Sequence, residues 1–268
     1  MIVKGSFLLE MGAVAALIAV GGGMFFRLSS APPPEVEIAG YATSLKGRTA
    51  SQRHNAERAA EFLDGKVIAP GAVFSFNKIV RSWAQDTGYV KAPVSYDGEL
   101  IKAYGGGVCQ TSTTLYNVAL LAGLPILERH PHVFAPHYVP PGRDAAVAQY
   151  TIDLRFRNPY PYPLRIHTDA HGDTLDIRLY GAKKPPQTAQ ISSDILETIT
   201  PQNLTRVAYR SDSHAGSAYL RNPGATGYRV VTYRILSKKG QETTRERLGD
   251  DTYQAMNHIV QVDDIAAQ

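Results

Sequence analysis

Cysteine is nearly absent from the chain, because Cys109 is the only one among its 268 residues. A single cysteine forms no intrachain disulfide, so the fold depends on a hydrophobic core. Dense runs of lysine and arginine are also lacking, and the net charge is only +4. The glycine triplet at 105–107 lacks the downstream Lys-Ser/Thr of a phosphate-binding loop. The sequence therefore predicts neither a nucleic-acid partner nor a nucleotide site.

The first 30 residues differ in composition from the rest of the chain. Lys4 precedes an apolar run at 7–26 that holds one acidic residue, and Arg27 follows it. A run of this length predicts an uncleaved N-terminal membrane anchor. The alternative is a secretory signal cleaved after Ala31, although the prolines at 32–34 are a poor context for cleavage. Both interpretations predict that the remaining chain lies outside the cytoplasm, either membrane-anchored or secreted.

Composition shifts divide the chain further. With 44% hydrophobic residues the chain can bury a core, and its length suits two small domains. The predicted parts are an anchor or signal at 1–30, a Pro-rich spacer at 31–40, a first domain at 41–182, a linker at 183–190 and a small β-rich module at 191–268.

Hydrophobic periodicity predicts the elements of these parts. One helix is expected at 50–64, with Ser51 as its N-cap and Gly65 at its end, and a second one from Cys109 to about 122. Apolar and polar residues alternate in several later segments, as in antiparallel strands. These segments are 125–130, 145–158, the hairpin 162–181, 228–236 and 258–262. The predicted fold class is α+β, with one central helix that starts at Cys109 and packs on an antiparallel sheet.

Cys109 follows three glycines, with Val108 between, and opens the predicted central helix. Unpaired N–H groups and the helix dipole at such a position lower the pKa of a thiol. The glycines would let a substrate approach closely. We therefore expect Gly105, Gly106, Gly107 and Gln110 to bind substrate around a reactive thiol. The alternative is that Cys109 is a small buried apolar residue, which is the more common fate of a free cysteine.

Histidines and an acid follow the central helix. His130, His132 and His137 lie in the segment 129–147, and Asp144 lies in its Gly-Arg-Asp turn. A thiol with a histidine and a carboxylate is the arrangement of a Cys–His–Asp nucleophile. His132 is the first choice for the base because the flanking prolines would hold its loop extended; His130 is second and His137 third.

Two questions about this cluster stay open in the sequence. Arg143 is predicted either to pair with Asp144 or to receive a substrate carboxylate. Cys109, His130 and His132 also offer ligand types that suit zinc. A second cysteine and a paired ligand spacing on a helix are both missing, so we expect no metal and no other cofactor.

Several motifs resemble those of the VanW domain, a family named for a protein of glycopeptide-resistance clusters. They are IAPGAVFSFN (68–77), GYVKAP (88–93), YGGGVCQTSTTLYNVALLAGL (104–124), ERHPH (128–132), YVPPGRDAAV (138–147) and DLRFRNPYPYPLRI (153–166). The resemblance covers roughly residues 40–180 and implies that Cys109, His130, His132 and Asp144 are shared polar positions. His137 departs from the family pattern.

The same resemblance implies a surface protein that works at the cell wall. The segment 227–262 is similar to a degenerate form of the glycine-rich wall module that often follows this domain. The order of Cys, His and Asp is also similar to that of transglutaminase and papain-like cysteine folds, which implies acyl transfer or amide hydrolysis.

These observations lead to one functional hypothesis. We expect an envelope protein with a papain- or transglutaminase-like domain that acts on peptidoglycan or another wall-linked amide. Cys109 would be the nucleophile, His132 the base and Asp144 the group that orients the base. The alternatives are a non-catalytic module that binds the cell wall and a protein of envelope assembly.

Overall fold

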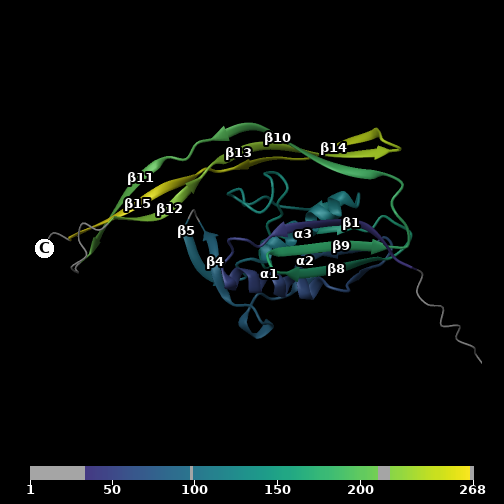
Figure 1. Cartoon of the computed structure of the whole chain (residues 1–268), viewed down its shortest axis with the longest axis horizontal. Helices are drawn as coiled ribbons and strands as arrows, with labels where there is room; N and C mark the ends of the chain where they lie inside the picture. The colour runs from purple at the N-terminus through teal and green to yellow at the C-terminus, as the bar shows by residue number, and fades with distance from the viewer. Residues whose placement is uncertain (1–33, 97–98, 211–217, 266–268) are drawn as a thin grey trace, which may run out of the picture. The chain divides into compact units, whose positions relative to one another are not determined.

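A computed structural model describes residues 34–96, 99–210 and 218–265 of the chain. Residues 34–268 form one compact unit. Its elements begin with strand β1 (Val36–Ser44), which starts inside the predicted spacer. Figure 1 shows their arrangement.

Two helices of equal length organise the first half of this unit. Helix α1 (Ala50–Leu63) begins with a capping box, in which Thr49 rather than Ser51 is the N-cap and Gln52 is its partner. Helix α3 (Val108–Leu121) follows Gly107, whose φ of 113° is rarely adopted by other residues. Both helices bury the apolar faces that the sequence predicts, which confirms the helical periodicity.

An antiparallel sheet with the strand order β1-β9-β8-β2 covers these helices. Its other strands are β2 (Val67–Ile68), β8 (Leu164–His171) and β9 (Thr174–Gly181). β8 and β9 form the predicted hairpin, which turns at Gly172. Alternate residues of β9 are buried, as expected of a sheet with one face on a core.

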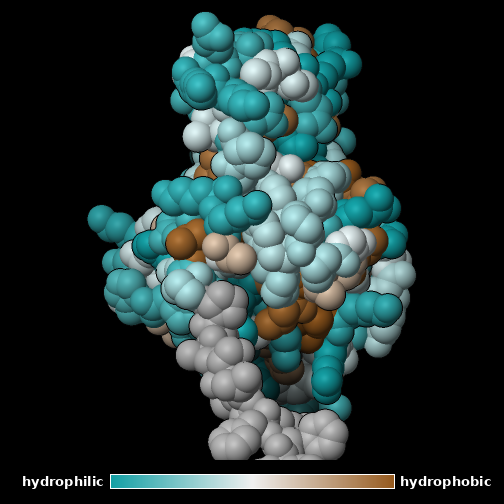
Figure 2. Space-filling view, turned by 90° about the vertical axis from the view of Figure 1, so that its right-hand side faces the viewer, coloured by the Kyte–Doolittle hydropathy of each residue, from teal (hydrophilic) through white to brown (hydrophobic). Residues whose placement is uncertain are grey.

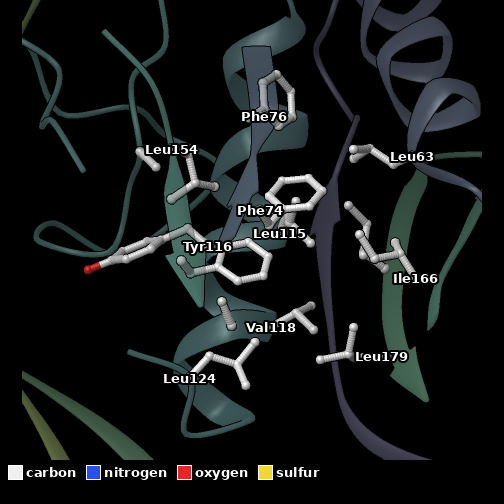
Figure 3. Close-up of a cluster of buried hydrophobic side chains, with 14 of the residues drawn as sticks. Leu63, Phe74, Phe76, Leu115, Tyr116, Val118, Leu124, Leu154, Ile166 and Leu179 are labelled. Atoms are coloured by element: carbon white, nitrogen blue, oxygen red, sulfur yellow. The ribbon is translucent and has the colours of Figure 1, made fainter. Parts of the chain in front are cut away.

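The core lies between α3, α1 and the sheets (Figure 3). Leu115 and Val118 of α3 meet Ile166 and Leu179 of the sheet there, and all four are almost without solvent exposure. Figure 3 also shows Phe74, which stacks on Phe156 with 4.7 Å between the ring centroids. On the face drawn in Figure 2, hydrophilic residues dominate and apolar ones form separate small groups.

Shorter elements complete the first half of the unit. A three-stranded sheet has the order β3-β7-β6, and a separate hairpin joins β4 to β5. These elements are β3 (Val73–Ser75), helix α2 (Phe76–Val80), the 3₁₀ helix η1 (Gln85–Thr87), β4 (Lys91–Tyr96), β5 (Glu99–Tyr104), β6 (Ile126–Glu128) and β7 (Arg155–Arg157).

Six longer strands follow, in two three-stranded sheets. The first has the order β10-β13-β14, and the second has the order β11-β15-β12. Their bounds are β10 (Thr188–Ile199), β11 (Asn203–Arg210), β12 (Ala218–Ala225), β13 (Gly227–Lys238), β14 (Gln241–Tyr253) and β15 (Met256–Ile265).

The predicted papain- or transglutaminase-like α+β fold is wrong. Strands account for 49% of the structure and helices for only 17%, and the described residues hold three α-helices. The long strands explain the error. Most side chains of β14, with the sequence QETTRERLGDDTY, are exposed and polar, so its pattern carries little apolar alternation. A prediction based on hydrophobic period underestimates such strands.

The predicted membrane anchor at 1–30 lies outside the described residues. Within the part of the chain that the structure describes, no helix has both the length and the apolar character needed to cross a membrane.

The first prediction concerns the junction before α3. A Cβ at Gly107 would lie 2.1 Å from the Gln52 carbonyl oxygen of α1, at a φ of 113°. We expect Gly107→Ala to lower the free energy of unfolding by at least about 3 kcal/mol, because backbone strain and steric overlap add. Urea denaturation measures the loss.

Gly172→Ala is the matched control for this variant. Gly172 also has a positive φ, but a Cβ there meets no atom within 4 Å. Its cost should be the strain alone, about 1–2 kcal/mol. Equal losses in the two variants would show that the contact with α1 is unimportant.

Candidate active site

The thiol of Cys109 lies in the first turn of α3, two residues after the Gly107 N-cap. Its side chain is partly buried, and Sγ donates to the Val147 carbonyl oxygen at 3.4 Å. The first N–H groups of a helix lack intrahelical acceptors, so they attract negative charge. Cys109 therefore lies at the helix start where the sequence places it, and its reactivity stays a prediction.

His132 and Asp144 form a close pair beside this thiol. His132 Nδ1 lies 2.5 Å from Asp144 Oδ2, and the His132 backbone N–H donates to the same oxygen at 2.8 Å. Asp144 is fully buried, and the His132 side chain is 24% exposed. With Nδ1 bonded to Asp144, Nε2 is the ring nitrogen left for the neighbouring Cys109 side chain, whose pKa His132 influences. The structure thus brings Cys109, His132 and Asp144 together, and the catalytic roles expected of them stay predictions.

Polar residues of α3 place the Asp144 segment next to the thiol. Ser112 Oγ donates to the Ala145 carbonyl oxygen at 2.6 Å, and the Ala145 N–H donates to Thr113 Oγ1 at 3.0 Å. Asn117 Nδ2 donates to the Arg143 carbonyl oxygen at 2.8 Å. These helix residues are buried, so the polar run after Cys109 serves to hold the chain that carries the acid.

Asp144 has two further partners that the sequence did not indicate. Arg129 Nη2 donates to Asp144 Oδ1 at 2.8 Å, and the Tyr253 hydroxyl donates to the same oxygen at 2.5 Å. Arg129 also bonds Asp251 through Nη1 at 2.5 Å. Arg129 belongs to the motif ERHPH, so its place in the site could have been predicted from that motif. Tyr253 and Asp251 lie on β14, where no motif in the sequence indicates a place in the site.

The pKa values follow from these contacts. Burial alone would raise the pKa of the Cys109 thiol, but the hydrogen bond and the charge of His132 outweigh it and lower that pKa. Burial alone would lower the pKa of His132, but the bonds to Asp144 and Cys109 raise it to about 10. Burial likewise opposes ionisation of Asp144, whose pKa is lowered to about 2 mainly by His132. The site therefore favours a thiolate beside an imidazolium.

His130 and His137 take no part in this pair. His130 Nε2 lies 3.3 Å from Glu128 Oε1, and its side chain is 43% exposed. His137 is exposed. Of the three histidines, His132 is the one with the bond to the acid.

The predicted substrate-binding glycines are packed against protein. A Cβ at Gly105 would lie 2.8 Å from the Trp83 ring, and one at Gly106 would lie 2.7 Å from the Pro93 carbonyl oxygen. Gly107 approaches Gln52 in the same way. These close approaches explain the three glycines without a substrate.

Gln110 and Arg143 also have internal partners. The buried Gln110 amide accepts from Arg48 Nε at 2.9 Å and donates to Thr43 and Ser44. Arg143 Nε donates to the Asn117 side-chain oxygen at 2.9 Å, and its guanidinium lies over the Tyr41 ring. Arg129, not Arg143, is the arginine bonded to Asp144.

Tyr138 and Arg48 are near the thiol and were missed in the sequence. The Arg48 guanidinium lies 4.7 Å from the centre of the Tyr138 ring. Burial raises the pKa of the Tyr138 hydroxyl above its usual value, and the negative charge of Cys109 raises it further. A neutral hydroxyl and a cation thus lie on the Cys109 side of the site. The described residues hold no group of three or more His, Cys, Asp or Glu side chains that could bind a metal ion.

Comparison with known proteins identifies a family for part of the chain. Residues 51–180 match the family model described as VanW like protein. The "Uncharacterized protein YoaR" of Bacillus subtilis is 38% identical over 146 residues, which are 54% of this chain and 48% of YoaR. The "Vancomycin B-type resistance protein VanW" of Enterococcus faecalis is 30% identical over 150 residues, 54% of each protein. The chain thus spans about half the length of these relatives.

Solved structures give a weaker likeness. An IgA1 protease G5 domain covers 30% of this chain and 94% of its own, at 20% identity and a TM-score of 0.20. The structure titled HP0197-G5 covers 28% of this chain and 96% of its own, at 18% identity and a TM-score of 0.16. Scores of this size give no support to the predicted glycine-rich module. The match to the VanW like protein model thus covers residues 51–180, a range that includes Cys109, His132 and Asp144.

Proposed function

We propose that the chain is an extracytoplasmic protein of the cell envelope that cleaves or transfers an acyl group through Cys109. The observation that carries the proposal is the bond from buried Asp144 to His132, together with the neighbouring thiol at the start of α3, whose pKa His132 lowers. The proposed substrate is a peptide of peptidoglycan or another wall-linked amide. The name of the Enterococcus relative, which refers to vancomycin resistance, supports an envelope substrate.

The proposed location and partners rest on the sequence of residues 1–30 and on the family. The apolar N-terminal segment supports export, either with retention at the membrane or with release after cleavage. The partner would be the cell wall. A module that only binds the wall, or one that serves envelope assembly, is the alternative that the experiments below separate from an enzyme.

The reaction would begin with attack of the Cys109 thiolate on the amide carbonyl carbon. The new S–C bond gives a tetrahedral oxyanion, whose negative charge the N-terminal end of the α3 dipole favours. The His132 imidazolium then donates its proton to the amide nitrogen, the C–N bond breaks and the amine leaves. An acyl thioester on Cys109 is the product of this half.

The second half regenerates the thiol. Neutral His132 accepts a proton from an incoming amine or water, which attacks the thioester carbonyl carbon. The C–S bond breaks, and Cys109 leaves as the thiolate. An amine acceptor makes the reaction a transfer, and water makes it a hydrolysis. Asp144 keeps the imidazole oriented in both halves, as its bond to Nδ1 implies.

The second prediction tests catalysis directly. We expect the full chain, incubated with purified peptidoglycan peptides, to give new amide or hydrolysed products detectable by mass spectrometry. Cys109→Ser should lower the rate at least about 1,000-fold, because a serine hydroxyl is a far weaker nucleophile without a strong base. His132→Ala should lower it at least about 100-fold through loss of proton transfer.

His137→Ala is the matched control for the histidine variant. His137 is exposed and lies in the same segment as His132, so its loss should leave the rate unchanged. Absence of products from the folded wild-type chain, together with retained binding to cell walls, would support the binding module instead of the enzyme.

The third prediction concerns pH. Because the pKa of Cys109 is lowered and that of His132 is about 10, the thiolate–imidazolium pair should form below the usual thiol pKa of about 8.5 and persist to about pH 10. Alkylation of Cys109 by iodoacetamide should therefore already be fast at neutral pH. Acyl transfer should fall above about pH 10, where His132 loses the proton that the leaving amine needs.

His132→Ala should reverse the shift of the thiol. Without the imidazolium, burial of Cys109 is left as the main influence and raises the pKa of the thiol. Alkylation of this variant should then require alkaline pH, while His130→Ala should follow the wild type. A wild-type profile centred near pH 8.5 would contradict the ion pair.

A further inference from the structure

The strand β14 lies outside the VanW-like segment 51–180, yet its C-terminal end reaches the acid of the candidate site. Tyr253 is fully buried, and its hydroxyl donates to Asp144 Oδ1 at 2.5 Å. The same hydroxyl accepts from the Gly142 N–H at 2.9 Å. One tyrosine therefore bonds both the acid and the backbone of the turn that carries it.

Three more contacts join this end of the chain to the site. The Gln254 N–H donates to the carbonyl oxygen of Val133, the residue after His132, at 2.8 Å. Asp251 Oδ2 accepts from Arg129, which itself bonds both the side chain and the backbone oxygen of Asp144. From β13, Thr232 packs so closely on Gly142 that a Cβ at Gly142 would lie 2.0 Å from Thr232 Oγ1.

We propose that Tyr253 and Asp251 of β14 are positioning residues that hold Asp144, and through it His132, in the orientation that activates Cys109. The active site is then a composite of the VanW-like segment and β14. This inference rests on the proposed function, because it assumes that the thiolate–imidazolium pair is the working form of the site.

Tyr253 and Arg129 set the orientation of the Asp144 carboxylate. A carboxylate can turn about its Cβ–Cγ bond, and its two oxygens here have different tasks. Oδ2 accepts from both N–H groups of His132, while Oδ1 accepts from Arg129 and Tyr253. The donors to Oδ1 fix the plane of the carboxylate. They thereby fix the position of Oδ2 and the orientation of the His132 ring towards the thiol. Asp251 acts on the carboxylate indirectly, because it holds the Arg129 guanidinium in place.

The test measures the pH dependence of Cys109 alkylation in the full chain with iodoacetamide, without substrate. Tyr253→Phe keeps the ring and removes the hydroxyl, and Asp251→Asn keeps the size and removes the charge. Each should move the midpoint of alkylation upwards by about half to one pH unit, the effect of about one hydrogen bond on the His132–Cys109 pair.

Thr232→Ala is the matched control. It weakens contact with the same turn, where Thr232 Oγ1 donates to the Gly142 carbonyl oxygen at 3.3 Å, but it removes no donor to Asp144. Its alkylation profile should follow the wild type. Should Tyr253→Phe fail to fold, Asp251→Asn and Thr232→Ala decide the question in the same way.

The outcomes separate this inference from the proposed function. A wild-type thiol with an ordinary pKa overturns the proposed function. A lowered wild-type pKa that folded Tyr253→Phe and Asp251→Asn leave unchanged overturns only the positioning role. An equal shift in all three variants would also overturn it, since general loosening of the contact would then explain the effect.

Discussion

The negative charge of Asp144 lies where solvent does not reach, and four hydrogen bonds from three residues, Arg129, His132 and Tyr253, hold it there. Removal of a carboxylate from water costs several kcal/mol unless its lone pairs are satisfied. The rest of the site depends on this one group. Its two oxygens fix the His132 loop, the Arg129 side chain and the end of β14 at a single point beside α3.

A lowered pKa of the Cys109 thiol is the chemical consequence of that arrangement. The partly enclosed position of Cys109 alone disfavours a thiolate, so the sign of its pKa shift depends on a partner with positive charge. His132 is that partner only while Asp144 stabilises its protonated form. The acid therefore acts on the sulfur through the imidazole, although its own charge, taken directly, raises the thiol pKa.

Local pattern predicted local structure well and long-range structure poorly. The alanine face of α1, the helix after the glycine triplet and the hairpin at Gly172 are each encoded within about twenty residues. Cys109, His132 and Asp144 could be grouped because their chemistry is distinctive. Tyr253 could not, since it meets Asp144 across 109 positions of sequence and tyrosine is an ordinary residue of strands. The extent of the sheets could not be predicted either, because β10 and β14 are largely exposed and show little apolar alternation.

Stability does not account for the buried network of Arg129, Asp144, Asp251 and Tyr253. Apolar side chains of similar volume would often fill such a space at equal or lower free energy. The attraction between buried ions rarely exceeds the free energy that each ion loses when it leaves water. Such a core would lack an acceptor for the Nδ1 proton of His132, and the imidazole would lose both its orientation and its charge. The network fixes the orientation of the Asp144 carboxylate, and with it the orientation of the His132 ring beside the sulfur.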